Sequence, residues 1–374
     1  MDSYKVLEEH FSKIKDERQE SKISHKLIDI IIIAICAVIC GADGWEDIEI
    51  FGKTKLKWLL SFLKLENGIP SADTFARVFS FIKPKEFEKC FLNWINSTVK
   101  TINKDIVSID GKTLRRSYDR KSNKAAIHMV SAWSSLNECV LGQIKTEEKS
   151  NEITAIPELL KVLNINGCIV TIDAMGTQKK IAEEIISGGG DYILPVKGNH
   201  PTLHREITAF FDSLETEHKD KKILYTEESD KKVHGRNEYR RYWLCEDIDW
   251  ITSKDEWKNI NTVGMTESYR TKNGKTTVKK KYYISSIQPE ISIFSRSVRK
   301  HWGIENSLHW CLDVAFREDE CRIRKGYASE NFAVVRHIAI NMLKREKTSR
   351  RGIAGKRLTA ALDDKYRMKV LKAK

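Results

Sequence analysis

Two aspartates stand directly after short apolar runs whose β-branched residues predict buried strands. Asp110 follows Ile106–Ile109, and Asp173 follows Cys168–Ile172. Ligands of open α/β sheets bind where strands leave the sheet, so we expect the two carboxylates to converge on one site. Carboxylate oxygens are the ligands that Mg²⁺ prefers, and the pair therefore predicts a divalent-metal site. The competing interpretation is a turn-forming or helix-capping role for each aspartate.

Glu305 is the candidate for a third carboxylate ligand. The sequence predicts one helix over residues 297–314, and Glu305 lies outside the apolar stripe of that helix. His301 and His309 precede and follow it by four residues, which puts all three on one helix face. The pattern predicts a metal-binding glutamate between two groups that contact phosphate. A His–Glu–His transition-metal site and a solvated helix face are alternatives. Four nearby acids compete with Glu305 as the third ligand: Asp313, Glu318, Asp319 and Glu320.

Basic residues follow the first aspartate. Lys112, Arg115 and Arg116 place positive charge next to Asp110, which suits the phosphates of DNA. Cutting or joining DNA is a displacement at phosphorus, and two carboxylate-bound magnesium ions assist such a reaction. The Gly-Lys-Thr triplet after Asp110 is not a P-loop, because the glycine required five residues before Gly111 is Ile106.

Two further segments carry side chains that suit DNA. Lys197 and Asn199 follow a predicted strand, where the lysine is expected to contact a phosphate and the asparagine a base or sugar. An ordinary strand-to-helix turn explains them equally well. In the segment HGRNEYRRYW, His234, Arg236 and Arg240 alternate with aromatic residues, a combination that suits DNA ends with unstacked bases. An edge strand protected by charge would look similar.

Composition agrees with an anionic partner. The 374 residues carry a formal net charge of +13, and the segment 344–374 holds twelve Lys or Arg against three Asp or Glu. Such a basic end predicts a phosphate-binding arm or a solvated helix. The eight cysteines include no Cys-x-x-Cys pair, which argues against a zinc ribbon. The longest apolar run, Ile30–Cys40, is too short to span a bilayer, and no signal peptide opens the chain. We therefore expect a cytoplasmic protein.

The order of predicted elements indicates an α/β protein in three parts. Residues 1–100 are predicted to be helical. Residues 101–345 start with three hairpin-connected strands and continue helix–strand–helix–strand, the order of an RNase H-like domain with a mixed five-stranded sheet and flanking helices. A β-rich insertion is expected at about residues 200–295, and residues 346–374 form a basic C-terminal tail.

Several long motifs in this order resemble the H-repeat-associated (ISAs-type) family of insertion-sequence transposases. This family is part of the DDE, retroviral-integrase-like superfamily, and the resemblance covers nearly the whole chain. The motifs are GIPSADTFARVF (68–79), SIDGKTLRRSY (108–118), TEEKSNEITAIPELL (146–160), TIDAMGTQ (171–178), GGDYILPVKGNHPTL (189–203), HGRNEYR (234–240), HWGIENSLHWCLDVAFRED (301–319) and NFAVVRHIAINMLK (331–344).

The resemblance implies Asp110, Asp173 and Glu305 as catalytic metal ligands. It implies Mg²⁺ as cofactor, with Mn²⁺ able to substitute, and DNA as partner: the terminal inverted repeats and the target. It also implies a helical transposase-associated N-terminal domain, a homo-oligomer assembled on DNA, and a location on the bacterial chromosome, with no membrane and no small-molecule substrate. Related transposases carry Tyr, Arg and Lys around the catalytic Glu, but these positions hold Val298, His301 and Leu312 here.

The sequence therefore predicts a transposase that cleaves insertion-sequence ends and transfers the strands into target DNA. Two other functions fit parts of the pattern. A stand-alone RNase H-like nuclease would share the metal site but not the joining step. A non-catalytic or domesticated remnant of a mobile element would keep only the DNA binding.

Overall fold

The fold is described by a computed structural model. It describes residues 3–100, 102–118, 125–146, 152–214, 222–233, 236–272 and 275–373. Contacts between residues divide the chain into two compact units. Unit 1 comprises Met1–Lys100, Gly111–Lys149 and Ile304–Lys374, and unit 2 comprises Thr101–Asp110 and Ser150–Gly303.

The N-terminal part of unit 1 is helical, as predicted. Its helices are α1 (Ser3–Phe11), α2 (Leu27–Ile39), α3 (Trp45–Thr54), α4 (Leu56–Leu59), α5 (Ala72–Phe81) and α6 (Pro84–Thr98). Helix α2 is the long apolar run, and its residues from Asp29 to Ile39 are all buried, as expected of a helix that is apolar on every side. Helix α5 is capped by Ser71, whose hydroxyl oxygen accepts the backbone N–H of Thr74 at 3.3 Å.

The remainder of unit 1 comes from two later stretches of the chain. These elements are β2 (Ile127–Ser134), β3 (Cys139–Lys145), a π-helix η3 (Ile304–His309), α11 (Trp310–Phe316), a 3-10 helix η4 (Glu318–Glu320), α12 (Ala328–Arg345), α13 (Ile353–Leu362) and α14 (Asp364–Lys372). Strands β2 and β3 pair antiparallel. Helix α12 is buried along most of its length and contacts α2, α5, α6 and β3, so it forms the centre of this unit.

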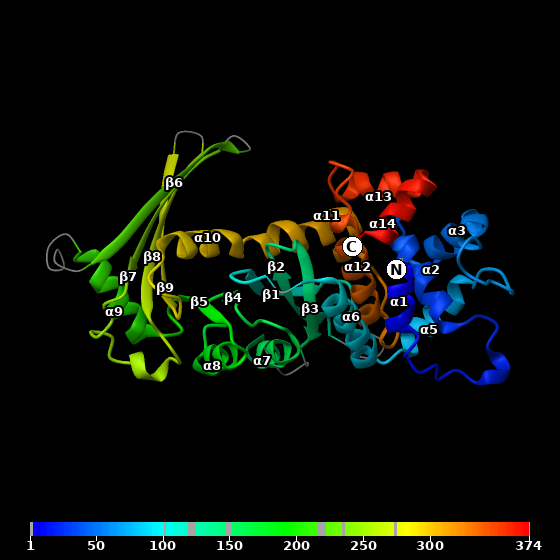
Figure 1. Ribbon diagram of the computed structural model, residues 1–374, viewed down its shortest axis with the longest axis horizontal. Helices are drawn as coiled ribbons and strands as arrows, with labels where there is room; N and C mark the ends of the chain where they lie inside the picture. The colour runs from blue at the N-terminus through cyan, green and yellow to red at the C-terminus, as the bar shows by residue number, and fades with distance from the viewer. Residues whose placement is uncertain are drawn as a thin grey trace. The chain divides into compact units, whose positions relative to one another are not determined.

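The basic C-terminal segment is folded into unit 1, and the prediction of an arm or solvated helix is wrong for its central residues. Arg357 donates from Nε to the carbonyl of Val38 at 3.1 Å, at the C-terminal end of α2. Arg367 is fully buried and lies over the Trp58 ring at 4.4 Å. Figure 1 draws α13 and α14 in red beside the blue N-terminal helices, and α13 contacts α2. These cations satisfy the carbonyls of a helix end and pack on aromatic rings.

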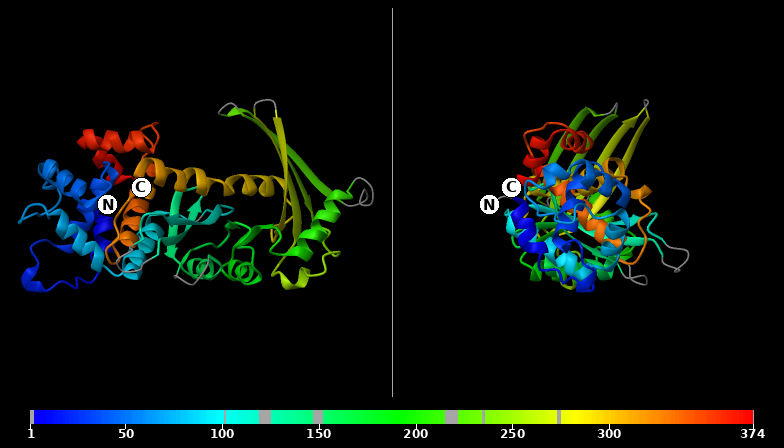
Figure 2. Two further views of the ribbon diagram at one scale, coloured as in Figure 1. Left: turned by 180° about the vertical axis from the view of Figure 1, so that it is seen from behind. Right: turned by 90° about the vertical axis from the view of Figure 1, so that its right-hand side faces the viewer.

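Unit 2 contains the larger part of the sheet. Its strands are the first residues of β1 (Ile106–Leu114), β4 (Ile169–Ile172), β5 (Asp191–Val196), β6 (Ile223–Val233), β7 (Arg236–Cys245), β8 (Thr262–Lys272) and β9 (Lys275–Ser285). Strands β1, β4 and β5 are parallel, whereas β9 pairs with β5 antiparallel. Strands β6 to β9 follow as antiparallel hairpin strands, and Figures 1 and 2 show them as one tall, curved sheet.

The sheet is larger than predicted. Its nine strands follow the order β3-β2-β1-β4-β5-β9-β8-β7-β6, and β1 contributes residues to both units. The five expected strands are present, but the β-rich insertion extends the same sheet through β9 instead of standing apart from it. The mixed five-stranded sheet is therefore corrected to nine strands. The physical reason is that β9 ends in the buried residues Tyr282–Ser285, which pair with β5.

Four α-helices flank the strands of unit 2. They are α7 (Glu152–Val162), α8 (Lys179–Ser187), α9 (Pro201–Asp212) and α10 (Ile291–His301); a 3-10 helix, η2, covers Lys254–Glu256. Helix α10 contacts β4, β5, β6 and β7, and Figure 1 shows α7 and α8 on the other side of the parallel strands. Phe294 of α10 packs directly on Gly264, where a Cβ atom would lie 2.3 Å from the ring. Gly264 thus allows the helix to approach the sheet closely.

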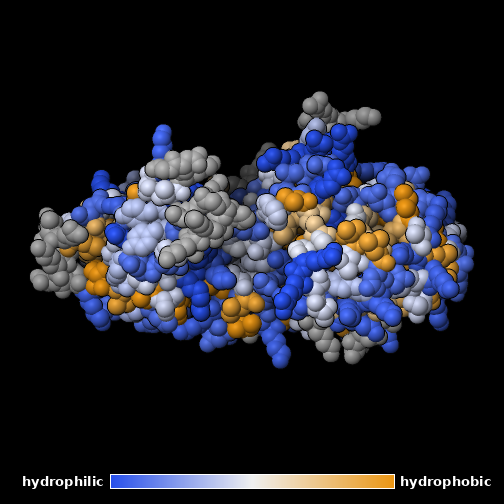
Figure 3. Space-filling view, turned by 90° about the horizontal axis from the view of Figure 1, so that it is seen from above, coloured by the Kyte–Doolittle hydropathy of each residue, from blue (hydrophilic) through white to orange (hydrophobic). Residues whose placement is uncertain are grey.

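The surface carries no extended apolar face in the view of Figure 3. Seen from above, it is mostly hydrophilic, with small separate hydrophobic patches. Within the described ranges, no helix has both the length and the apolar character needed to cross a bilayer.

Candidate active site

The parallel pairing of β1 and β4 ends directly before Asp110 and Asp173, because its last register pair is Ile109 with Ile172. Asp173 follows the end of β4, as predicted, but the prediction that Asp110 ends its strand is wrong, since β1 continues to Leu114. Such strands lie about 4.8 Å apart. Both aspartates are half-buried. Behind them, the hydroxyl of Thr171 donates to Ser108 Oγ at 3.2 Å.

Asp173 also forms a turn. Its Oδ1 accepts the backbone N–H of Gly176 at 2.9 Å, which is the turn-forming role considered from the sequence. Its second oxygen, Oδ2, has no hydrogen-bond partner among the described residues. The turn fits only glycine at position 176, because a Cβ atom there would lie 2.2 Å from Ile172 Cγ2. One carboxylate oxygen therefore fixes the loop while the other stays available as a ligand.

The loop after Asp173 is held by the loop that follows β5. Asn199 donates from Nδ2 to the carbonyl of Ala174 at 2.8 Å, and His200 Nε2 lies 2.6 Å from the carbonyl of Thr177. The buried Thr177 hydroxyl donates to Pro195 O at 2.7 Å. Sequence reasoning missed Thr177 and His200, although their polar side chains next to a strand-end aspartate were a signal. Asn199 thus positions the loop that follows Asp173. The side chain of Lys197 is exposed.

Replacing Asn199 by Asp is expected to loosen this loop. The substitution keeps the side-chain shape but removes the donor to Ala174, a loss of about 1 kcal/mol. Backbone amides at residues 174–177 should then exchange hydrogen about fivefold faster, and more Mn²⁺ should be needed for half-maximal cleavage. Hydrogen-exchange mass spectrometry checks the first result. Asn96→Asp, at an exposed position of α6, is the matched control, and equal exchange in both variants contradicts the role.

Glu305 lies in unit 1, in the π-helix η3. The prediction of one continuous α-helix over residues 297–314 is wrong, because α10 ends at His301 and α11 begins at Trp310. A π turn holds slightly more residues than an α turn, so Glu305 and His309, four residues apart, still lie near one face of this segment. Glu305 is exposed, and its carboxylate forms no hydrogen bond or ion pair with any residue that the structure describes. Single π turns often occur at functional sites.

The four acids that compete with Glu305 all have cationic partners within unit 1. Lys112 Nζ lies 2.6 Å from Asp313, 2.9 Å from Glu318 and 3.4 Å from Asp319. Glu320 pairs with Arg317. Each of these four carboxylates therefore has a cationic partner, whereas Glu305 has none among the described residues.

Lys112 holds the centre of this cluster, and its side chain is only 13% exposed. Burial opposes its charge, but Glu318 and Asp313 raise the pKa of its ammonium above the usual value. Burial would also raise the pKa of Glu318, yet Lys112 and Arg336 hold it below its usual range. Three carboxylates surround the ammonium, so Lys112 joins β1 to the segment after the π-helix instead of facing DNA phosphates.

The other predicted DNA contacts differ in exposure. The Arg115 side chain is 77% exposed and pairs with Asp319 at 3.2 Å, and Arg116 is exposed. Arg240 is 13% exposed and pairs with Glu228 at 3.5 Å across the β6–β7 hairpin, as a charge-protected strand would. His309 is half-buried at the end of the π-helix. His234 and the side chain of Arg236 lie outside the described residues.

His301 is largely buried on the inner side of α10. Its Nδ1 lies 3.1 Å from the hydroxyl of Thr171, next to the Asp173 strand end. Burial, with the nearby charge of Lys281, lowers the pKa of His301 to about 4. The ring is therefore neutral at physiological pH, and it supplies a hydrogen bond to β4 instead of a charge for phosphate.

The buried histidines predict acid-sensitive folding. Burial lowers the pKa of His337 in α12 to about 4, as it does for His301. Between pH 6.5 and 4 the unfolded chain binds more protons, so the free energy of unfolding should fall as pH falls, by about 1.4 kcal/mol per pH unit for each histidine. Urea unfolding from pH 7 to pH 4.5 measures this slope. His301→Gln should reduce the change in the free energy of unfolding per pH unit by the contribution of one histidine. An unchanged pH dependence contradicts the role of His301 in it.

The carboxylates present suit magnesium more than a transition metal. Among the residues that the structure describes, no three His, Cys, Asp or Glu side chains are grouped as a metal site, so neither the His–Glu–His alternative nor the three-carboxylate site has geometric support. Magnesium is commonly bound by one or two carboxylates together with water and substrate phosphates. The adjacent Asp110 and Asp173 fit that mode of binding.

Comparison with known proteins gives matches along nearly the whole chain. The family model described as DDE_Tnp_1-associated matches residues 8–95, and the one described as Transposase DDE domain matches residues 102–342. From Escherichia coli strain K12, "H repeat-associated putative transposase YhhI" and "Putative protein YbfL" are each 46% identical to this chain, over 98% of both chains. "Putative transposase YncI" from Escherichia coli O157:H7 is 42% identical, over 99% of this chain and 95% of its own.

Proposed function

Because the chain belongs to the DDE transposase family, among its H-repeat-associated members, we propose that it cleaves the ends of an insertion sequence and joins them to target DNA. The observation that carries the proposal is the register of β1 and β4, which sets Asp110 beside Asp173 within the DDE domain. This domain implies an RNase H-like core for the parallel strands. The proposed partners are the inverted repeats and target DNA, and the proposed assembly is a homo-oligomer on DNA.

Asp110 and Asp173 are proposed to hold Mg²⁺, and Glu305 to complete the site. Two metal ions at such a site activate the attacking oxygen and stabilise the leaving one. Asp173 is fixed by the Gly176 turn and by Asn199, so one carboxylate oxygen keeps its direction. Within unit 1, the π-helix of Glu305 packs on β2, and Lys112 of β1 pairs with Asp313 of α11. The role of Glu305 as a third ligand rests on the family resemblance.

The proposed reaction has two displacements at phosphorus. Water first attacks the phosphodiester at the element end, which breaks the P–O bond and leaves a free 3′-hydroxyl. That hydroxyl then attacks a target phosphodiester and forms a new P–O bond as the target strand breaks. Exposed Arg115, Arg116 and Lys197 are proposed to hold DNA phosphates near this reaction, and they supply affinity without reading sequence.

A two-stage assay with the full-length protein and Mg²⁺ tests the proposal. The first stage supplies intact element ends and measures nicking, and the second supplies pre-cleaved ends and measures joining to a plasmid. Nicking and joining together support a transposase. Nicking without joining supports the stand-alone nuclease, and DNA binding without either reaction supports the non-catalytic remnant.

A further inference from the structure

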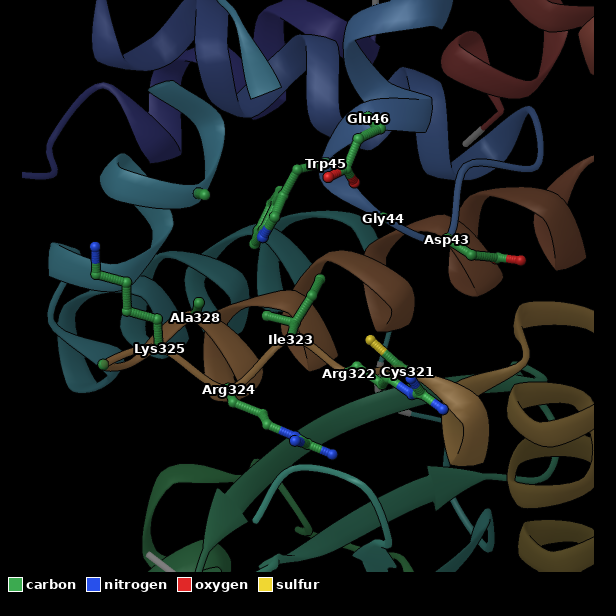
Figure 4. A pocket seen from close by; sticks show the side chains of 12 residues that line it. Asp43, Gly44, Trp45, Glu46, Cys321, Arg322, Ile323, Arg324, Lys325 and Ala328 are labelled. Atoms are coloured by element: carbon green, nitrogen blue, oxygen red, sulfur yellow. The ribbon is translucent and has the colours of Figure 1, made fainter. Parts of the chain in front are cut away.

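A pocket of about 660 Å³ lies within unit 1. It is lined by the start of α3, by α5 and by the connection between η4 and α12. Figure 4 shows the Trp45 indole projecting into it, with Ile323 and Ala328 beyond the ring. The volume lies in the range of small-molecule sites, about 300–1,000 Å³, and is too small for a DNA duplex. A single nucleotide is an occupant of suitable size.

The charges of the pocket favour an anion. Arg322, Arg324 and Lys325 supply three cations from one short stretch of chain, and Figure 4 shows them around the side opposite α3. Two acids, Asp43 and Glu46, also line the pocket. The Asp43 carboxylate lies 3.2 Å from Arg357, which compensates its charge. The pocket therefore keeps three cations against one uncompensated carboxylate.

Arg324 connects this pocket to the end of β1. Its Nε donates to the carbonyl of Arg116 at 2.8 Å, and its guanidinium lies over the Tyr118 ring at 4.6 Å. These contacts fix the plane of the guanidinium and leave its terminal nitrogens for a ligand. Arg324 thus joins the pocket to the segment that follows β1 within unit 1.

Trp45 is held rigidly enough to serve as one wall of a site. Its ring stacks on Phe79 with centroids 5.3 Å apart and meets Phe332 edge-on at 5.2 Å. The indole is nevertheless only half-buried, and its N–H forms no hydrogen bond with the residues described. A fixed aromatic side chain beside cations is the usual setting for an unpaired nucleotide, because bases contact the ring while the cations hold phosphate.

We propose that this pocket binds one unpaired nucleotide of the DNA strand, with the phosphate at Arg322, Arg324 and Lys325 and the base against Trp45 and Ile323. The inference rests on the proposed function, since it takes DNA as the partner. It assigns to the N-terminal helical part of the chain a direct contact with the strand. A paired duplex does not enter the pocket, so the site selects DNA with an unpaired end or an extruded nucleotide.

Binding of fluorescent oligonucleotides at several salt concentrations tests the site. Arg322→Gln/Lys325→Gln removes two exposed cations that have no structural hydrogen bond within the described ranges. It should weaken binding of single-stranded DNA about tenfold and reduce the slope of log K against log salt by about 1.4, since each phosphate contact contributes about 0.7. Lys365→Gln/Lys369→Gln makes the same charge change at exposed positions of α14 and should leave the slope unchanged.

A photo-crosslink locates the nucleotide independently. An oligonucleotide with 5-iododeoxyuridine at an unpaired end should crosslink to Trp45, as identified by mass spectrometry, and a fully paired duplex should not. Equal salt slopes for the two double variants, or a crosslink only at other residues, overturns the proposal. The proposal is also overturned if the Arg322/Lys325 variant no longer binds free deoxynucleoside triphosphate but binds the oligonucleotide with unchanged affinity.

The two proposals fail in different ways. If the unaltered protein neither binds nor cleaves DNA, the proposed function fails. If it cleaves and joins DNA but the Arg322/Lys325 variant has the same affinity and salt slope, only the pocket assignment fails.

Discussion

Asp110→Asn and Asp173→Asn are each expected to reduce strand cleavage at least about a thousandfold, while DNA binding and folding stay intact. Asparagine keeps the shape of the side chain but removes the negative charge that a divalent metal requires. Loss of about 4 kcal/mol of transition-state stabilisation corresponds to that factor. Cleavage of labelled element ends with Mg²⁺ measures the effect, and isothermal titration with Mn²⁺ gives a readout that does not depend on turnover.

The control for this prediction is Asp249→Asn. Asp249 is an exposed acid of unit 2 whose ion partner is Lys254, 2.5 Å away, and its loss should leave cleavage unchanged. Glu305→Gln belongs to the same series and should match the aspartate variants. If Glu305→Gln retains cleavage, the third ligand is another group, and Asp313→Asn is the next variant to assay. If either aspartate variant cleaves at the wild-type rate, the proposal that Asp110 and Asp173 hold the metal is contradicted.

Lys112→Met is expected to lower the free energy of unfolding by about 3–5 kcal/mol. It leaves Glu318 buried with Arg336, 3.6 Å away, as its remaining cation, and it removes the ammonium that Asp313 and Asp319 share. Removing one partner of a buried ion pair costs far more than the pair itself contributes, because the remaining charge is uncompensated. Urea unfolding monitored by circular dichroism measures the change.

A double-mutant cycle separates this charge effect from lost packing. Lys112→Met/Glu318→Gln should be more stable than Lys112→Met alone, because the uncompensated carboxylate is gone. Lys347→Met, which breaks the exposed ion pair with Glu138, should cost less than about 1 kcal/mol. Equal losses of unfolding free energy for Lys112→Met and Lys347→Met would contradict the proposal that Lys112 stabilises the buried ion cluster.

The buried strands before Asp110 and Asp173 could be predicted from their apolar β-branched runs, but the continuation of β1 to Leu114 could not, because the residues directly after Asp110 are polar or glycine. The nine-stranded sheet could not, since the exposed residues of Lys275–Lys280 conceal the buried end of β9 that pairs with β5. The π turn was hidden too, because Ile304 and Leu308 have the spacing of an ordinary α-helix. Only the folded chain shows why Lys112 is not a phosphate ligand, since its partners lie about two hundred residues later.

Buried arginines misled the interpretation of the C-terminal segment. A charged residue counts as exposed in any reading of composition, yet Arg367 packs on Trp58 and donates to the carbonyl of Ala360 at 2.9 Å. Composition does not show whether the fold brings helix carbonyls and aromatic rings into contact with such cations.

The contact between Arg357 and the end of α2 has a consequence for how the protein is made. Helix α2 leaves the ribosome early, but the guanidinium that packs on its C-terminal end and donates to Val38 is synthesised more than three hundred residues later. Closing so long a loop is slow, and until then the isoleucine-rich helix lacks part of its cover. Nascent chains of this protein should therefore depend on chaperones through most of translation, and a premature stop before residue 353 should yield an aggregating product.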